Sequence, residues 1–407
     1  MIRPILITVL VALLIVACDK KTVSQDGAGV LQVADILNAD SSGGFARVHR
    51  TKKFEFPDDH LAHPEYKHEW WYFTGNLSSQ AGHRFGYQLT LFRFGLIPDS
   101  QEIYSSDYMS SSGSSKFHSS NWRANHFYMA HFAITDVSAN KFSSYEKFSR
   151  KALGLAGAQA LGSAKDSKGI KLWLDDWRVE SQGDGVFPLK VTASKNDLKI
   201  DLLLKPEKPV VLHGFNGLSQ KGKKQGNASF YYSITRLDTQ GTLAANGTTY
   251  KVSGNSWYDR EWSTSALEAD QRGWDWFSLQ LSDGRDIMFY KLRRKDGTSD
   301  EFSSGTLVGL GEQYRTLPAE DVVVEVKDYW VSPHSGIKYP SAWTLTIPKD
   351  QLELSIEPLV ADQEHNLVFR YWEGAVKISG YQYKGNSNKK LTGYGYVELA
   401  GYQAPVQ

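Results

Sequence analysis

Four tryptophans lie close to Asp259 and Glu261 in the segment GNSWYDREWSTSALEADQRGWDWFSLQL, which spans residues 254–281. If SWYDREW forms a β-strand, its side chains alternate between two faces, and Trp257, Asp259 and Glu261 share one face. The two carboxylates would then lie about 7 Å apart, at a rise of roughly 3.3 Å per residue. In an indole-lined barrel lumen, desolvation would raise the pKa of at least one of them. This arrangement predicts a general acid.

The opposite orientation of the same strand predicts no chemistry. Asp259 and Glu261 would then be solvated and would pair with Arg260 or Arg272. The nearby indoles also have a structural interpretation, because aromatic side chains on strands often fill β cores and indole N–H groups find acidic partners there. Both interpretations stay open for four residues: Trp257, Trp262, Trp274 and Trp276.

A second aromatic segment, HPEYKHEWWYFTGNL at residues 63–77, contains Glu69 and Trp71. Its pattern favours packing in a β core, with Glu69 and Trp71 as candidates to face a ligand. Glu69 could also join His60, His63 and His68 as zinc ligands, since imidazole and carboxylate suit that ion. The spacing matches no zinc motif, so we expect ordinary histidines and no metal site.

Several familiar catalytic motifs are missing from the sequence. There is no G-x-S-x-G nucleophile elbow, no H-E-x-x-H zinc motif, and no phosphate-binding glycine loop. These absences disfavour a conventional serine hydrolase and enzymes that use NAD or ATP, and we expect no cofactor. Forty-six basic residues balance forty-five acidic ones, so the formal charge of +1 provides no field that would gather nucleic acid.

The N-terminus predicts an export signal. Arg3 precedes an apolar run at residues 5–16, which is shorter than the roughly 20 residues that span a bilayer. The only cysteine, Cys18, follows Leu-Ile-Val-Ala and resembles the acylated cysteine of bacterial lipoproteins. By the same resemblance, Asp19 favours retention at the inner membrane. We therefore expect residues 1–17 to be a signal peptide and Cys18 to anchor the chain on the periplasmic face.

Residues 18–48 are rich in glycine and polar side chains, which predicts a tether. Beyond Cys18 there is no thiol, so the exported part has neither a disulfide nor a cysteine nucleophile. Its stability must come from packing.

Hydrophobic side chains beyond the tether alternate with a period of two, as in FGYQLTLFRFG at residues 85–95 and FYMAHFAITDV at 127–137. Asp283 and Gly284 lie between two such runs and predict a hairpin turn. Only residues 152–164 are a candidate helix, and their glycines weaken it. The pattern predicts an all-β protein of antiparallel barrels or sandwiches.

At 407 residues the chain is long enough for two hydrophobic cores. The polar, turn-rich stretch at residues 241–251 predicts the break between them, giving domains at 49–240 and 250–404. A serine-rich stretch at residues 105–121 predicts a surface loop.

Five blocks of the sequence together resemble a known family. They are HPEYKHEWWYFTGNL, NWRANHFYMAHFAITD, LGLAGA, WYDREWSTS, and the C-terminal pair YWEGAVKISG and GYGYVELAGY. In this order they are similar to the lipocalin-like AttH family of secreted hydrolases, which is related to carotenoid 1,2-hydratase. The resemblance implies two consecutive lipocalin-like antiparallel β-barrels after the tether, with ligand space near their junction.

The hydratase relatives add water to an isoprenoid double bond without a cofactor. By resemblance, Trp257, Tyr258 and Asp259 match the aromatic and acidic positions, with Asp259 as proton donor. The resemblance also implies an accessory role beside an ABC-type permease. Three functions stay open: a lipid-anchored carrier of a hydrophobic or amphipathic ligand, a hydratase or hydrolase that uses Asp259, Glu261 and Glu69, and carbohydrate binding on exposed tryptophans.

Overall fold

The computed structural model describes residues 43–98, 125–162, 168–265, 267–385 and 387–404. These residues form two curled antiparallel sheets and three short 3-10 turns, Asp58–His60, Ala319–Asp321 and Pro348–Asp350. None of the helices in these ranges has the length and apolar character needed to cross a membrane. The predicted signal peptide, Cys18, Asp19, most of the tether and the serine-rich stretch lie outside the described residues.

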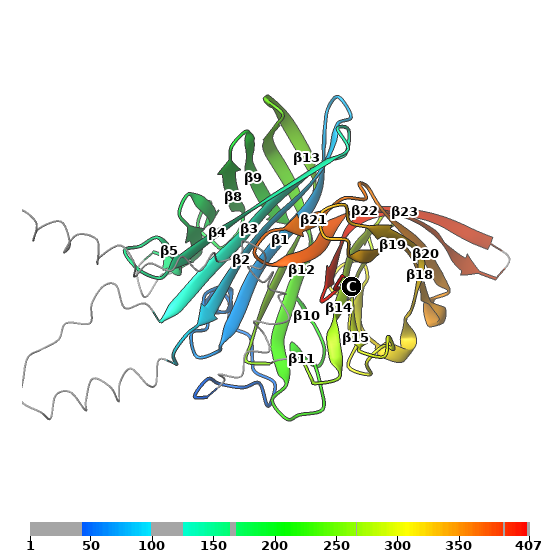
Figure 1. The fold of residues 1–407 in the computed structure, drawn as a ribbon, viewed down its shortest axis with the longest axis horizontal. Helices are drawn as coiled ribbons and strands as arrows, with labels where there is room; N and C mark the ends of the chain where they lie inside the picture. The colour runs from blue at the N-terminus through cyan, green and yellow to red at the C-terminus, as the bar shows by residue number, and fades with distance from the viewer. Residues whose placement is uncertain (1–42, 99–124, 163–167, 266, 386, 405–407) are drawn as a thin grey trace, which may run out of the picture. The chain divides into compact units, whose positions relative to one another are not determined.

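The first sheet curls into a nearly closed barrel of thirteen described strands, in the order β4-β3-β2-β1-β13-β12-β9-β8-β7-β6-β5, with β10 and β11 also pairing with β12 (Figure 1). Its strands are β1 His68–Ser79, β2 Arg84–Gly95, β3 His126–Asp136, β4 Lys141–Arg150, β5 Ala156–Leu161, β6 Gly169–Leu174, β7 Trp177–Ser181, β8 Leu189–Lys195, β9 Leu198–Pro206, β10 Val211–Leu212, β11 Leu218–Gln220, β12 Ala228–Ala245 and β13 Thr248–Ser263.

The second sheet forms a half-barrel in the order β17-β16-β15-β14-β23-β22-β20-β19-β18, with β21 pairing with β22. Its strands are β14 Gln271–Leu281, β15 Asp286–Arg294, β16 Ser304–Val308, β17 Tyr314–Pro318, β18 Val323–Val331, β19 Lys338–Ile347, β20 Leu352–Pro358, β21 Glu364–Asn366, β22 Arg370–Lys384 and β23 Ser387–Ala400. The fold is therefore all-β and lipocalin-like, as the sequence predicts.

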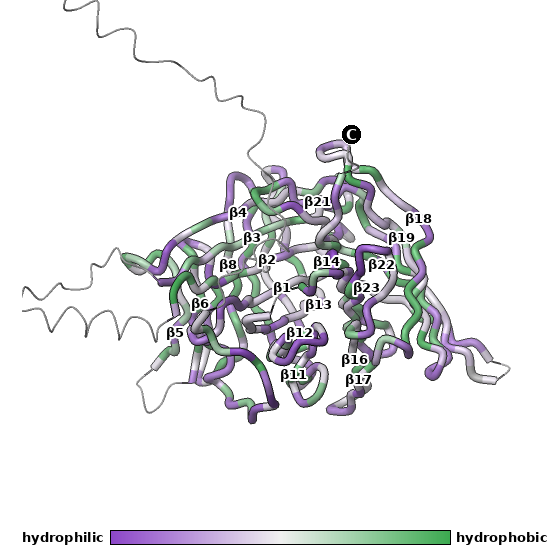
Figure 2. Tube along the Cα trace, turned by 60° about the horizontal axis from the view of Figure 1, so that its bottom comes forward, coloured by the Kyte–Doolittle hydropathy of each residue, from purple (hydrophilic) through white to green (hydrophobic). Residues whose placement is uncertain are grey.

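The period-two pattern of the sequence builds both cores. Phe85, Tyr87, Leu89 and Leu91 alternate along β2, and all four pack inside the first barrel. A separate core lies on one face of the second sheet and includes Trp343. Hydrophobic and hydrophilic residues accordingly mix along the strands of both sheets (Figure 2). The predicted turn at Asp283 and Gly284 joins β14 to β15, with Gly284 at φ 87°.

Three local expectations differ from the structure. The candidate helix contains strand β5, because Leu153 and Gly154 adopt positive φ angles, 53° and 71°, that interrupt a helix. The predicted break at residues 241–251 is the hairpin between β12 and β13, and the change of sheet falls between β13 and β14. Val48, assigned to the tether, is buried in the barrel core.

The two sheets touch along β1, β2, β12 and β13 of the first and β14, β15, β22 and β23 of the second. Direct hydrogen bonds join them: Tyr72 Oη donates to Glu373 Oε1 at 2.5 Å, and Asn76 Nδ2 donates to the Gly395 carbonyl at 3.0 Å. We call the side of the first sheet that looks at the second sheet the cavity face, and the side that looks into the first barrel the barrel face.

Candidate active site between the two sheets

Strand β13 divides the predicted site residues between its two faces. Trp257 belongs to the hydrophobic cluster between the sheets, and Asp259 and Glu261 line a cavity there. Because side chains alternate along a strand, Tyr258, Arg260 and Trp262 point the other way. The carboxylates therefore face the second sheet and not the lumen of the first barrel.

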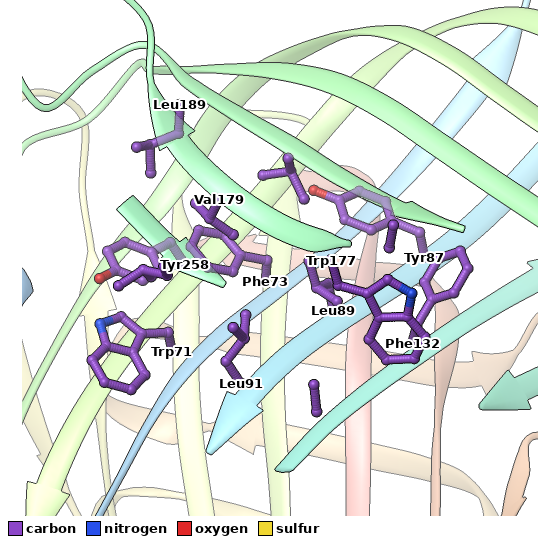
Figure 3. Packing of buried hydrophobic residues seen from close by; sticks show 14 of the residues in the cluster. Trp71, Phe73, Tyr87, Leu89, Leu91, Phe132, Trp177, Val179, Leu189 and Tyr258 are labelled. Carbon is purple, nitrogen blue, oxygen red and sulfur yellow. The ribbon is translucent and has the colours of Figure 1, made fainter. Parts of the chain in front are cut away.

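Three residues that the sequence analysis assigned to the catalytic or ligand-binding site lie on the barrel face. Tyr258 and Trp262 of β13 and Trp71 of β1 are at most 1% exposed and pack in the first barrel core. Tyr258 stacks on Phe73 with ring centroids 4.6 Å apart, and Figure 3 shows both beside Trp71. None of the three lines the cavity, so their part is to hold β1 and β13 in place.

Glu69 also lies on the barrel face, where it is completely buried. It forms ion pairs with Arg93 of β2 and Arg260 of β13. Burial opposes ionisation of this carboxyl, but the two guanidinium groups hold the pKa of Glu69 well below its usual range. Glu69 is therefore a fixed structural anion away from the cavity, and Arg260, which pairs with it, does not pair with Asp259.

The histidines considered as zinc ligands do not converge. His60 contacts the Tyr232 hydroxyl at 2.6 Å, and His63 stacks on Trp262 with centroids 3.9 Å apart. His68 points to the cavity face and contacts Ser263 Oγ at 2.8 Å. Within the described ranges, no three acidic, histidine or cysteine side chains are grouped to hold a metal ion.

The cavity has a volume of about 140 Å³. Its walls come from both sheets and combine aromatic rings with a few polar groups, which is typical of a small-molecule site. The first sheet and the segments beside it contribute His68, Trp70, Tyr72, Gln88, Thr90, Phe92, Phe94, Lys221, Tyr231, Asp259, Glu261, Ser265 and Leu267. The second sheet contributes Trp274, Trp276, Tyr290, Leu292, Tyr371, Glu373 and Glu398.

Asp259 is the most enclosed acid of β13, with 3% of its surface exposed. Its Oδ1 accepts hydrogen bonds from Trp257 Nε1 at 2.5 Å and from Ser233 Oγ, and its Oδ2 accepts one from Tyr231 Oη at 2.5 Å. These donors favour the ionised form, yet burial outweighs them and raises the pKa of Asp259 to about 7. Asp259 can therefore hold a proton near neutral pH.

Glu261 is in a different electrostatic position. Its Oε1 lies 3.2 Å from Lys221 Nζ and also accepts a hydrogen bond from Ser229. Burial disfavours the charged form of Lys221, but Glu261 and Tyr290 more than compensate, so the pKa of Lys221 lies above its ordinary value. Two carboxyl groups on one strand face thus differ, because among the described residues Glu261 has a cationic partner and Asp259 has none.

The sequence also matches a known protein family over most of its length. The sequence model of the AttH-like family matches residues 47–402. The chain belongs to the AttH-like family. The crystal structure of an AttH protein from Nitrosomonas europaea is 29% identical, with a TM-score of 0.72 over 88% of this chain and 100% of that one.

This AttH-like chain is also similar to kievitone hydratase. The enzyme of Fusarium solani subsp. phaseoli is 23% identical over 223 residues, which cover 53% of this chain and 61% of that protein. The chain thus matches less than two thirds of its curated relative. The structure of kievitone hydratase from Nectria haematococca has the same fold, at 15% identity and a TM-score of 0.59 over 89% of this chain and 98% of that one.

The second sheet supplies two acids that the sequence analysis of the AttH-like chain did not assign. Glu373 accepts hydrogen bonds from Tyr72 and from Gln88 Nε2, the latter at 2.7 Å, and burial and the nearby Glu398 raise its pKa well above the usual range. Burial likewise raises the pKa of Glu398 to about 7, although Trp274 Nε1 donates to it at 3.0 Å.

Strand register explains how these acids meet the predicted tryptophans. Trp276 pairs with Glu398, which in turn pairs with Glu373 across β14, β23 and β22, so all three project from one face. Trp274 lies two residues along the same face and also lines the cavity. The C-terminal blocks that resemble the family contain both glutamates, and this was the available signal for them.

Proposed function

We propose that the protein binds a hydrophobic, alkene-bearing molecule of the isoprenoid type between its two sheets and adds water to it without a cofactor. The observation that supports this proposal is Asp259, an acid at the wall of an aromatic cavity that has no cationic partner within the described ranges and has a pKa of about 7. A general acid works best when its pKa lies near the working pH.

The proposed reaction needs one proton donor and one water molecule. Asp259 gives its proton to one alkene carbon, and the π electrons form the new C–H bond, which leaves a cation on the neighbouring carbon. Water attacks that carbon and forms the C–O bond. The proton that this water loses returns to the Asp259 carboxylate, so the acid is regenerated and no charge accumulates.

The other lining residues suit such a cation. Aromatic faces stabilise positive charge through their π electrons, and the cavity presents the rings of Trp70, Trp274 and Trp276. The name of the curated relative, kievitone hydratase, points to the same reaction class.

The test is hydration of kievitone as a probe by the purified protein, followed by mass spectrometry for the addition of one water. We expect Asp259→Asn to lower turnover at least 100-fold, the size typical for loss of a general acid. Asp296→Asn, in an exposed turn, is the matched control and should keep full turnover. Full activity in Asp259→Asn would remove this acid from the mechanism.

A carrier of a hydrophobic or amphipathic ligand is the second candidate, and the predominance of aromatic rings in the cavity favours it. Carriage without chemistry predicts that kievitone, or a lipid retained through purification, binds unchanged and that Asp259→Asn leaves its affinity nearly unaltered. Native mass spectrometry separates the two candidates, because hydration changes the mass of the ligand and carriage does not.

We further propose that Cys18 is acylated and holds the protein at the periplasmic face of the inner membrane, where it serves an ABC-type permease. The support is the sequence alone, from the apolar run at residues 5–16 to Asp19. We expect Cys18→Ser to abolish incorporation of labelled fatty acid and to release the protein from membranes in fractionation. A Cys18→Ser variant that still takes up the label would contradict the anchor.

A further inference from the structure

The hydrogen bonds around Asp259 show which of its contacts can reverse direction. The Trp257 indole N–H can only donate, so its bond to Oδ1 is fixed. Tyr231 Oη accepts from Trp276 Nε1 at 3.0 Å and therefore directs its single proton to Asp259 Oδ2. Both contacts keep the same direction whether or not Asp259 carries a proton.

Ser233 is different, because a hydroxyl can donate or accept. Its Oγ lies beside Asp259 Oδ1 on one side and 2.6 Å from His213 Nε2 on the other. The second ring nitrogen, His213 Nδ1, lies 2.8 Å from Thr306 Oγ1 on β16 of the second sheet. Ser233, His213 and Thr306 are each at most 1% exposed, so water does not replace these partners.

Few charged or titratable groups surround this series of hydrogen bonds from Asp259 to Thr306. Tyr231 of β12 lies against the His213 ring, with centroids 4.3 Å apart. Lys221 helps burial to lower the pKa of His213 to about 3, so this imidazole stays neutral. Glu261 on β13, Glu398 on β23 and Tyr72 on β1 also interact with Asp259.

We propose that Ser233 and His213 are positioning residues that form a reversible relay and let Asp259 exchange between its protonated and ionised forms. The inference rests on the proposed function, in which Asp259 must visit both forms in every turnover. Neither residue lines the cavity, so both act through Asp259 and not on the ligand.

The relay has two proton arrangements with the same number of hydrogen bonds. When Asp259 is ionised, Ser233 donates to Oδ1 and accepts from the Nε2–H tautomer of His213. When Asp259 is protonated, Oδ1–H donates to Ser233, which donates to Nε2, while Nδ1–H of His213 donates to Thr306. A neutral histidine carries one donor and one acceptor and exists as either of two tautomers, so each arrangement has a His213 tautomer that satisfies it.

Removing either partner unbalances the two forms in opposite directions. In His213→Leu, the Ser233 hydroxyl keeps only Asp259 to donate to, which favours the carboxylate. We expect the pKa of Asp259 to fall by about one unit, the size of one such hydrogen bond. In Ser233→Ala the carboxylate loses a donor, and we expect its pKa to rise by about the same amount.

The test follows the Asp259 carboxyl directly by infrared titration, with its band identified by subtraction of Asp259→Asn. His213→Gln, whose amide oxygen can still accept from Ser233, and Ser233→Thr, which keeps the hydroxyl, are the matched controls and should titrate as the wild type does. If His213→Leu does not fold, His213→Met replaces it. Shifts of the same sign in the two test variants, or no shift, would overturn the relay.

Activity on kievitone distinguishes failure of the relay from failure of the proposed function. If the relay and the proposed function both hold, the pH at which activity falls on the basic side is lower in His213→Leu and higher in Ser233→Ala. These shifts match the pKa of Asp259 measured by infrared titration. Opposite infrared shifts without any hydration would leave the relay standing and reject hydration. If hydration depends on Asp259 but the two infrared pKa shifts are not opposite, the proposed function stands and the relay is rejected.

Discussion

At the scale of single residues, the site depends on which carboxyl groups have cationic partners. Glu69 lies between Arg93 and Arg260, which hold its pKa well below the usual range, and Glu261 lies beside Lys221. Asp259 has hydrogen-bond donors but no cationic partner in the part of the chain that the structure describes. The same chemical group thus serves as a structural anion in one place and as a proton-holding acid in another, because the local partner decides the balance against desolvation.

The raised pKa of Asp259 has a consequence for stability. The folded-state pKa of about 7 exceeds the unfolded value of 3.8. The unfolded chain therefore ionises first, and the wild type loses stability as pH rises from about 4 to 7, by at most roughly 4 kcal/mol. Asp259→Asn escapes this loss but disturbs the hydrogen bond from Tyr231, which costs about 1–2 kcal/mol at every pH.

We therefore expect Asp259→Asn to unfold more easily than the wild type at pH 4 and less easily at pH 8, where the gain is about 2 kcal/mol. Urea unfolding at both pH values measures this change of sign. Glu261→Gln is the contrasting variant: it leaves Lys221 without its partner and should be less stable at pH 8. If the free energies of unfolding of Asp259→Asn and the wild type differ by the same amount at both pH values, the pKa of Asp259 is not raised.

At the scale of elements, alternation along β1 and β13 separates the barrel core from the cavity. Trp70 and Tyr72 of β1 pair with Glu261 and Asp259 of β13 on the cavity face. A slip of one residue would exchange the two sets and turn the core rings of Trp71, Tyr258 and Trp262 toward the cavity, and this fixes the register. Close approach of the sheets adds a second constraint: a Cβ on Gly86 would lie 2.6 Å from Tyr396 Oη.

At the scale of the whole described molecule, the cavity exists only while the two sheets stay together. Asp286 of β15 is fully buried and bridges them: its carboxylate lies 2.7 Å from Lys208, in the connection between β9 and β10, and 2.5 Å from Arg236 of β12. Thr235 Oγ1 also donates to it at 2.9 Å. Removing only the anion, or only one of the cations, would leave a buried charge without its partner, so this contact holds the sheets together.

Asp286→Asn should therefore weaken the coupling between the sheets, because Lys208 and Arg236 would be left facing each other without the anion. We expect a loss of about 3–5 kcal/mol in the free energy of unfolding and a second transition in calorimetry as the sheets unfold separately. Asp201→Asn, which removes an exposed pair with Lys190, is the control and should cost less than about 1 kcal/mol. A single transition of unchanged midpoint in Asp286→Asn would reject this role.

The sequence by itself determined the all-β class, the strand faces and the shared face of Trp257, Asp259 and Glu261, because these follow from a period of two and from local turn chemistry. It could also identify the family through blocks spread along the chain. It placed the boundary between the sheets inside the β12–β13 hairpin, since polar turn residues mark a hairpin and a linker equally well.

Only the tertiary structure decided which face of β13 meets the cavity and which acids gather there. The separation of Asp259 from Arg260, the pairing of Glu261 with Lys221, and the arrival of Glu373 and Glu398 from the second sheet all depend on contacts between residues far apart in the chain. A carboxyl group becomes an acid at neutral pH through burial and missing countercharges, and both are properties of the assembled sheets.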